Sequence, residues 1–425
     1  MSHACGVDFG TSNSTVGLHR PGQPALLTLE QDKFTLPSVV FFNADEDEVN
    51  YGRAALSSYL AGYEGRLMRS MKSLLGTSLI DGQTEVQGRA LPFRQLLAHY
   101  IGELKRRGEQ SAGQSFTQAV FGRPVHFIDD DRKADRIAQD TLEEIARSVG
   151  FKDIQFQYEP IAAAIDYESR IHKEELVLIA DIGGGTSDFS LLRLSPERST
   201  QIERHNDILG NGGVHIGGTD FDKYLSLTQV MPLLGLGGKL GNGTEVPSAH
   251  YFNLATWHTI NLLYSQKVAR EMQDIYRDAN NDDLRTRLER FLHLLDQRDG
   301  HWLAIKSEEA KIMLSDQDSI SLKLERLRSK TQSQLECVLT LDQDGFQSAI
   351  GHLMDQIAIT IQKVMDDAGV TAADIDTVFF TGGSSGVRGL RARIAAMVPD
   401  AKRVEGDLFG SIGAGLGLDA HRRFG

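Results

Sequence analysis

The stretch that decides the fold is LVLIADIGGGTSDFSLLRL, residues 176–194. An apolar run ends at Asp181, the glycines Gly183 to Gly185 follow, and a second apolar run leaves the turn. Two apolar runs around a glycine-rich turn predict a β-hairpin. Glycines let backbone N–H groups converge on an anion, and a carboxylate at the strand end suits a hydrated Mg²⁺. An ordinary glycine-rich hairpin would read the same, so a phosphate-binding interpretation needs further support.

That support comes from a second copy of the pattern near the N-terminus. The sequence CGVDFGTSNSTVG, residues 5–17, again has a strand, an aspartate (Asp8), a Gly-Thr-Ser turn and a strand leading out. A repeated hairpin predicts two similar lobes, each presenting a phosphate loop to one cleft. The chain has no G-x-x-x-x-G-K-[ST] sequence, and no helix directly follows the glycines as a dinucleotide fingerprint requires.

Composition narrows the class of protein and its partners. The 425 residues are 40% hydrophobic and 24% charged, which is typical of a soluble globular protein of a few domains. A net charge of −13 argues against binding along a nucleic-acid backbone, although Mg²⁺ can supply positive charge at a nucleotide site. Only two cysteines, no signal peptide and no membrane-length apolar run predict a cytoplasmic protein without a membrane partner.

The remaining elements alternate between strands and helices, which predicts the α/β class. Residues 132–149 have apolar positions at the helical period, and Gly150 ends that helix. Residues 159–165 predict an alanine-rich helix that packs closely enough to cross between lobes. Arg66, Arg69 and Lys72 recur at helical spacing, so they would share one solvated face of a helix.

Taken together, the motifs resemble the nucleotide-binding domain of the seventy-kilodalton heat-shock (DnaK-type) chaperones, in the actin-like ATPase superfamily. Each motif is only moderately specific, but the ordered set extends over nearly the whole chain. In chain order the matching segments are GVDFGTSNS at 6–14, MKSLLG at 71–76, Pro124 with Arg132, EPIAAA at 159–164, DIGGGTSD at 181–188, HIGGTDFD at 215–222, Glu308 with Lys311 and Ser315, GGS at 382–384, and Asp407.

The resemblance implies bound ATP or ADP with Mg²⁺, and a role for each matching residue. Asp8 and Asp181 would hold the Mg²⁺ mainly through water, Glu159 and Thr186 would order the water network, and Lys72 would complete the γ-phosphate site. Pro124 and Arg132 would relay the nucleotide state between lobes. The implied nucleotide contacts are Gly10, Thr11, Ser12, Asn13, Gly183, Gly184, Gly185, Thr186, Gly218, Glu308, Lys311, Ser315, Gly382, Gly383, Ser384 and Asp407.

The implied fold is a two-lobed actin-like ATPase with duplicated ribonuclease-H-like lobes and a nucleotide cleft between them. Lobe I would comprise residues 1–172, lobe II residues 173–408, and a crossing helix at 409–425 would return to lobe I. The sequence stops just after this helix, so the linker, peptide-binding domain and lid of the family are expected to be missing. A client or co-chaperone would then need another surface.

Three departures from the family pattern affect the expected site. Ile312 occupies the position of an arginine that stacks on adenine, a contact worth about 1 kcal/mol, so nucleotide affinity is expected to be weaker or base preference looser. Gly386 occupies the arginine position of the adenosine loop, and Arg388 lies two residues late. Residues 225–305 follow the family poorly.

The resemblance therefore implies an ATP-binding, slowly ATP-hydrolysing, chaperone-like protein whose lobes close with nucleotide. An inactive nucleotide sensor or an actin-like polymerising protein remains open as an alternative. A small-molecule kinase of the sugar-kinase type is a further one, although no carboxylate base has a clear place for it.

Overall fold

The computed structural model describes residues 3–128, 131–328, 337–407 and 410–425. The chain divides into two compact units. Unit 1 comprises Met1–His215, Ile359–Ser385 and Ala395–Gly425, and unit 2 comprises Ile216–Ala358 and Gly386–Ile394.

Unit 1 contains two five-stranded sheets with the same topology. In the first sheet, β1 is antiparallel to β2, β2 is antiparallel to β3, and β9 and β10 continue the other side in parallel. Its strands in sheet order are β10 (Asp153–Tyr158), β9 (Gln118–Arg123), β1 (Ala4–Phe9), β2 (Asn13–Gly17) and β3 (Leu36–Pro37).

The second sheet repeats this arrangement strand for strand. Here β11 is antiparallel to β12, β12 to β13, and β16 and β17 continue in parallel. The repeat read from Asp8 and Asp181 is thus confirmed, together with the α/β class and the duplicated sheet of an actin-like ATPase fold. The strands in sheet order are β13 (Ile208–Val214), β12 (Ser187–Leu194), β11 (Glu175–Ile182), β16 (Thr377–Thr381) and β17 (Lys402–Glu405).

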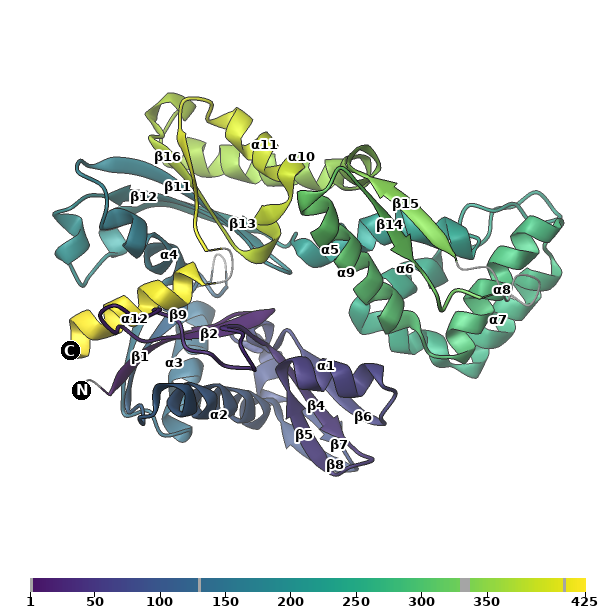
Figure 1. Ribbon diagram of the computed structural model, residues 1–425, viewed down its shortest axis with the longest axis horizontal. Coiled ribbons are helices and arrows are strands. Elements are labelled where there is room, and N and C mark those ends of the chain that lie inside the picture. The colour runs from purple at the N-terminus through teal and green to yellow at the C-terminus, as the bar shows by residue number, and fades with distance from the viewer. Residues whose placement is uncertain (1–2, 129–130, 329–336, 408–409) are drawn as a thin grey trace. The chain divides into compact units, whose positions relative to one another are not determined.

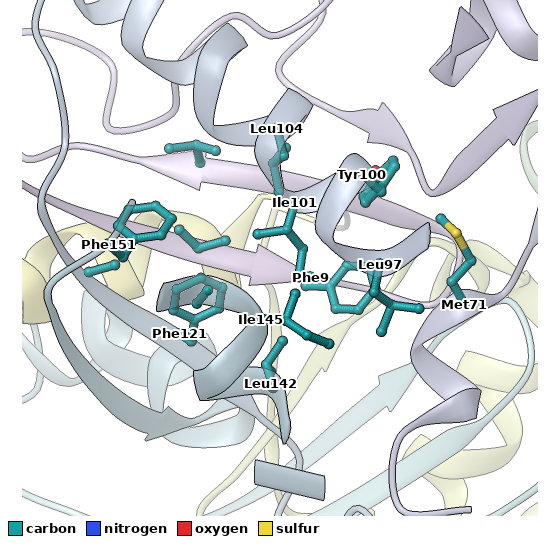
Figure 2. Packing of buried hydrophobic residues seen from close by; sticks show 14 of the residues in the cluster. Phe9, Met71, Leu97, Tyr100, Ile101, Leu104, Phe121, Leu142, Ile145 and Phe151 are labelled. Carbon is teal, nitrogen blue, oxygen red and sulfur yellow. The ribbon is translucent and has the colours of Figure 1, made fainter. Parts of the chain in front are cut away.

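The first sheet packs against α2 (Phe93–Ala112) and α3 (Arg132–Ser148), which lie side by side on one of its faces (Figure 1). Figure 2 shows the core between them, in which Phe9 and Phe121 of the sheet meet Leu97 and Leu142 of the helices. Met71 is also fully buried in this core, so the short helical turn that carries it is fixed to the sheet.

Two further helices, α4 (Glu159–Glu168) and α12 (Ser411–Phe424), pack against each other and cover a small apolar cluster with β1 and β9. Their contact depends on small residues. A Cβ atom on Gly415 would lie 1.9 Å from the Ala162 carbonyl oxygen, and one on Gly17 would lie 1.9 Å from that of Gly413. No side chain fits at either position, so α12 requires Gly415 where it contacts α4, and β2 requires Gly17 where it contacts α12.

A smaller sheet in unit 1 corrects one prediction from the sequence. β6 (Gly65–Arg69) pairs antiparallel with β4 (Val39–Asn43), so Arg66 and Arg69 lie on a strand and share no helical face with Lys72. The helical spacing of these three basic residues is a weaker influence than pairing with the edge of β4, which makes the segment a strand. The other elements of this region are β5 (Glu48–Tyr51), α1 (Gly52–Leu60), the 3-10 turns η1 (Met71–Leu74) and η2 (Ser78–Asp81), β7 (Gln83–Val86) and β8 (Arg89–Pro92).

Unit 2 is mainly helical between residues 252 and 315, and a two-stranded antiparallel sheet follows these helices in the chain. Two helices, α10 (Gln343–Asp367) and α11 (Arg388–Met397), have residues in both units. None of the described helices has the length and apolar character to cross a membrane. The main elements of unit 2 are α5 (Gly218–Leu225), α6 (Ala249–Ala255), α7 (Gln266–Arg277), α8 (Asp282–Asp296), α9 (Gly300–Asp316), β14 (Ser319–Lys323) and β15 (Val338–Asp342).

Candidate functional site

An ion pair between Lys72 and Glu159 forms the centre of the candidate site in unit 1. The Lys72 Nζ lies 2.5 Å from Glu159 Oε1, and the two side chains are only 12% and 13% exposed. Lys72 lies on η1, directly after the buried Met71, and Glu159 is the first residue of α4. A Cβ atom on Gly122 would lie 3.2 Å from Glu159 Cγ, so the end of β9 leaves just enough room for the glutamate.

Two aspartates with raised pKa values stand at the ends of the matching strands β1 and β11. Burial, followed by the charge of Glu159, raises the pKa of Asp8 to about 7. Burial, followed by the charge of Asp188, raises the pKa of Asp181 to about 8. Lys72 lowers the pKa of both carboxyls without offsetting these effects. The site therefore has more carboxylates than ammonium groups and favours a cation.

The two predicted phosphate loops meet within unit 1. A Cβ atom on Gly184 would lie 2.1 Å from the Ser12 Oγ, so the first loop touches the second where the second has no side chain. Among the described residues, a Cβ atom on Gly185 would meet no atom within 4 Å, which leaves space for a ligand next to the loop. In this conformation the Gly183 N–H donates to the Thr186 carbonyl at 2.9 Å.

The turn after β16 completes this part of unit 1. Gly382 has a φ of 81°, and a Cβ atom there would lie 2.4 Å from Asp181 Oδ1. Only glycine fits, because the left-handed backbone and the close approach to Asp181 both exclude a side chain. Gly383 and the buried Ser384 continue from this turn as a 3-10 helix. Asp407 is exposed after β17, the parallel neighbour of β16.

The predicted adenosine residues of α9 all lie in unit 2. Glu308 is exposed, and the Ser315 hydroxyl donates to the Lys311 carbonyl within the helix. Lys311 is 8% exposed, and its Nζ donates to Asp222 Oδ2 at 2.9 Å and to the Gly218 carbonyl at 3.2 Å. Gly218 thus begins α5 next to Lys311, and the ammonium of Lys311 is bound to protein groups.

The two predicted relay residues lie at the end of β9 and at the start of α3, and Arg123 is bonded to the first of them. Pro124 follows β9, and Arg132 is exposed as the first residue of α3. Sequence reasoning missed Arg123, whose Nε donates to the Pro124 carbonyl at 3.0 Å. An arginine that ends an apolar strand directly before a proline was the available signal. Asp188 is part of the quoted DIGGGTSD motif, but sequence reasoning assigned no role to it. Its negative charge helps to raise the pKa of Asp181.

The donor set fits a magnesium ion held mainly through water. Within the described residues, no three His, Cys, Asp or Glu side chains form a ready-made metal site. Mg²⁺ commonly keeps several waters and takes only one or two carboxylates together with substrate phosphates. Asp8 and Asp181, at the ends of β1 and β11, can supply those carboxylates.

Comparison with known proteins gives one family match and one curated relative that cover most of the chain. The family described as "Hsp70 protein" matches residues 4–230 and 293–416. The gap in this match, residues 231–292, lies inside the segment that departs from the motif pattern. The protein named "Chaperone protein DnaK" from Deinococcus proteolyticus is 25% identical over 428 aligned residues, which cover 96% of this chain and 56% of that protein. The chain therefore spans about half the length of the curated relative that it matches.

Proposed function

The chain belongs to the Hsp70 family, and from that premise we propose that it binds Mg-ATP and hydrolyses it slowly as a chaperone-type nucleotide switch. The observation that carries the proposal is the buried Lys72–Glu159 pair, electrostatically coupled to Asp8 and Asp181. Hsp70 proteins are chaperone-type ATPases, which supports an ATPase here. Slow turnover and the switch are our inference from the resemblance.

Lys72 is suited to the γ-phosphate because it keeps its proton. Burial lowers the pKa of the Lys72 ammonium, but Glu159 and Asp8 outweigh burial, so its pKa is raised overall. Lys72 would therefore place a fixed positive charge beside the γ-phosphate oxygens while the phosphoryl group is transferred from ADP to water. Phosphoryl transfer depends mainly on such positioning and charge stabilisation.

The other residues of unit 1 would orient the phosphates and the attacking water. Glu159 and Thr186 would order that water, and Asp8 and Asp181 would hold the hydrated Mg²⁺. When bound, the Mg²⁺ neutralises phosphate charge. Backbone groups at 10–13 and 183–186 would hold the β- and γ-phosphates.

Four further features of the proposal come from the resemblance. Glu308, Lys311, Ser315, 382–384 and Asp407 would contact adenosine. Pro124 and Arg132 would relay nucleotide state. The two lobes would be residues 1–172 and 173–408, with a crossing helix at 409–425, and they would close on ATP. X-ray scattering with and without Mg-ATP tests this closure, because closed lobes make the chain more compact.

A client or co-chaperone in the cytoplasm would be the partner.

Phosphate release from Mg-ATP without an acceptor tests the proposal. We expect release by the native chain and a fall of about 10²-fold or more in Lys72→Ala, because a group that stabilises transition-state charge is lost. Lys152→Ala, which changes an exposed lysine of unit 1, should leave the rate unchanged. Absence of phosphate release by the native chain would refute the proposed hydrolysis, and absence of ATP binding would refute the nucleotide site as well.

An inactive nucleotide sensor is the second candidate, favoured by one observation. Lys311 is bound to Asp222 and Gly218, and the neighbouring Ile312 is 56% exposed without a guanidinium to stack on adenine. Binding of Mg-ATP without phosphate release would favour this reading over the ATPase.

A further inference from the structure

Arg123, the last residue of β9, makes an extensive set of hydrogen bonds. Its Nη2 donates to both carboxylate oxygens of Asp135, at 3.0 and 2.8 Å, and to the Val125 carbonyl at 3.1 Å. Its Nη1 donates to Gln139 Oε1 at 2.5 Å, and its Nε to the Pro124 carbonyl. The side chain is 12% exposed. The planar fork of the guanidinium therefore joins the end of β9 to the first two turns of α3.

The same guanidinium packs against two aromatic rings. Its central carbon lies 5.3 Å from the ring centres of Phe127 and Tyr158. Tyr158 is the residue opposite Arg123 in the parallel pairing of β9 and β10. The Phe127 N–H donates to Asp135 at 2.6 Å, so the carboxylate that binds Arg123 also fixes the turn. Arg123 thus connects the start of α3 to the last residue of β10.

Tyr158 is followed directly by Glu159, the partner of Lys72. In the described part of the chain no side chain caps the N-terminus of α4, so the position of Glu159 depends on the end of β10. Gly122, the residue before Arg123, limits the space around Glu159 Cγ. A shift of the β9 end relative to β10 would therefore move the Glu159 carboxylate away from Lys72 Nζ.

We propose that Arg123 is a positioning residue for the Lys72–Glu159 pair. Its fork holds the β9 end, the α3 start and Tyr158 in one arrangement, and that arrangement sets where Glu159 meets Lys72. The effect of Arg123 on catalysis rests on the proposed ATPase function. The effect of Arg123 on the Lys72–Glu159 ion pair does not rest on that function, so the two effects can be measured separately.

The first measurement is the rate at which acetyl N-hydroxysuccinimide ester labels Lys72 in the full chain, read by peptide mass spectrometry. A buried, paired ammonium reacts slowly. In Arg123→Met, which keeps the aliphatic stem but removes the fork, we expect Lys72 labelling to rise about fivefold or more, as a loss of about 1 kcal/mol would give. Asp135→Asn should raise it in the same direction, and Arg123→Lys by an intermediate amount.

Two controls separate positioning from general loosening. Lys311 is equally buried and paired, but it lies in unit 2, so its labelling should stay constant in the same sample. Arg136→Ala removes an exposed arginine of α3 and should leave Lys72 labelling unchanged. An equal rise at Lys311, or no rise at Lys72 in a folded Arg123→Met chain, would overturn the proposal. If Arg123→Met does not fold, Arg123→Lys and Asp135→Asn decide the same question.

The second measurement is single-turnover hydrolysis of ATP in a preformed complex of the chain with Mg-ATP, with the ATP Kd measured alongside. We expect Arg123→Met to lower the rate about tenfold while the Kd changes by less than about threefold, because positioning acts on the chemical step. A rate that is unchanged while Lys72 labelling rises would overturn the catalytic part. If the native chain hydrolyses no ATP, the proposed function fails, and the labelling result still decides the role of Arg123 in the ion pair.

Discussion

The β1–β2 and β11–β12 hairpins share one topology but are held in place differently. In each, an aspartate is the second-last residue of the first strand, and Asp8 faces Thr15 where Asp181 faces Asp188. Two residues earlier, the first hairpin pairs Gly6 with Gly17, whereas the second pairs Ile179 with Ser190. The hairpins therefore agree at the ligand end and differ along their strands.

The helix α12 explains this difference. Cβ atoms on Gly6 and Gly17 would lie 2.3 Å and 1.9 Å from backbone atoms of α12. At the matching positions of the second hairpin, Ile179 and Ser190 are buried with their side chains present. The strand glycines Gly6 and Gly17 therefore allow α12 to pack closely, whereas the aspartates and glycine turns, present in both hairpins, are the parts that we assign to the proposed ligand.

Exchanging the residue at one matched position of the two hairpins tests the packing role of the strand glycines, and it has the largest expected effect on stability. Gly17→Ser introduces into β2 the residue that β12 carries, and it should destabilise the chain by about 3 kcal/mol, because a Cβ atom overlaps the Gly413 carbonyl. The reverse change, Ser190→Gly, should cost only about 1 kcal/mol, from backbone entropy and a lost hydrogen bond to Asn211. Urea denaturation without nucleotide measures both, and equal losses would contradict the comparison.

The two aspartates predict different pH dependences of stability. The native pKa of Asp181, about 8, and of Asp8, about 7, both lie above their ordinary value of 3.8. The folded chain thus keeps protons that the unfolded chain has lost, so these groups favour folding below pH ~4, and that stability is lost as the pH rises through their native pKa values.

The test is urea denaturation in EDTA between pH 5 and 9, about the window set by these pKa values. Asp181→Asn should make the decline less steep up to pH ~8, whereas Asp8→Asn should make it less steep only up to pH ~7, because in each variant the other aspartate still titrates. Mg-ATP binding, which needs ionised carboxylates, should strengthen over the same range in the native chain. A native chain whose stability rises from pH 5 to 8 would contradict the assignment.

Local sequence patterns predicted the repeated parts of the molecule well. Alternation of strands and turns around Asp8 and Asp181 located both hairpins, and apolar periodicity located α3 at 132–148 against an expected 132–149. These features depend on residues close in the chain. The basic spacing of Arg66 and Arg69 misled because β4, more than twenty residues earlier, pairs with that segment.

The site was less predictable, because its contacts join distant segments. The Lys72–Glu159 pair spans 87 residues, and Lys311 binds Asp222 across 89. The resemblance named Lys72 and Glu159 as functional, but nothing local indicated that they bind each other. Arg123 gave only a weak signal, since its partners in α3 and β10 are known only from the fold.

The loops themselves are also stabilised differently, which gives a smaller predicted effect. The first loop depends on a neighbour, because the buried Ser38 hydroxyl donates to the Gly10 carbonyl at 2.6 Å. The second loop is internally bonded, with the Thr186 hydroxyl donating to the exposed Asp188 at 2.9 Å. Ser38→Ala should cost about 1–2 kcal/mol, and Thr186→Val about 0.5 kcal/mol. Hydrogen exchange should show faster opening of residues 10–13 in Ser38→Ala alone, and unchanged exchange there would contradict this difference.

Two adjacent glycines of the second loop, Gly184 and Gly185, are expected to differ in their effects on stability and on ligand binding, and a single added methyl group at each position tests this difference. Gly184 touches Ser12 of the first loop, whereas Gly185 borders open space. Gly184→Ala should lower stability by about 1 kcal/mol, because the Ser12 hydroxyl must rotate away, and Ser12→Gly in the same chain should restore it. Gly185→Ala should leave stability unchanged but weaken Mg-ATP binding, since its methyl group enters the space left for phosphate. If Gly184→Ala alone weakened binding, the ligand space would lie between the loops at Ser12 and not beside Gly185.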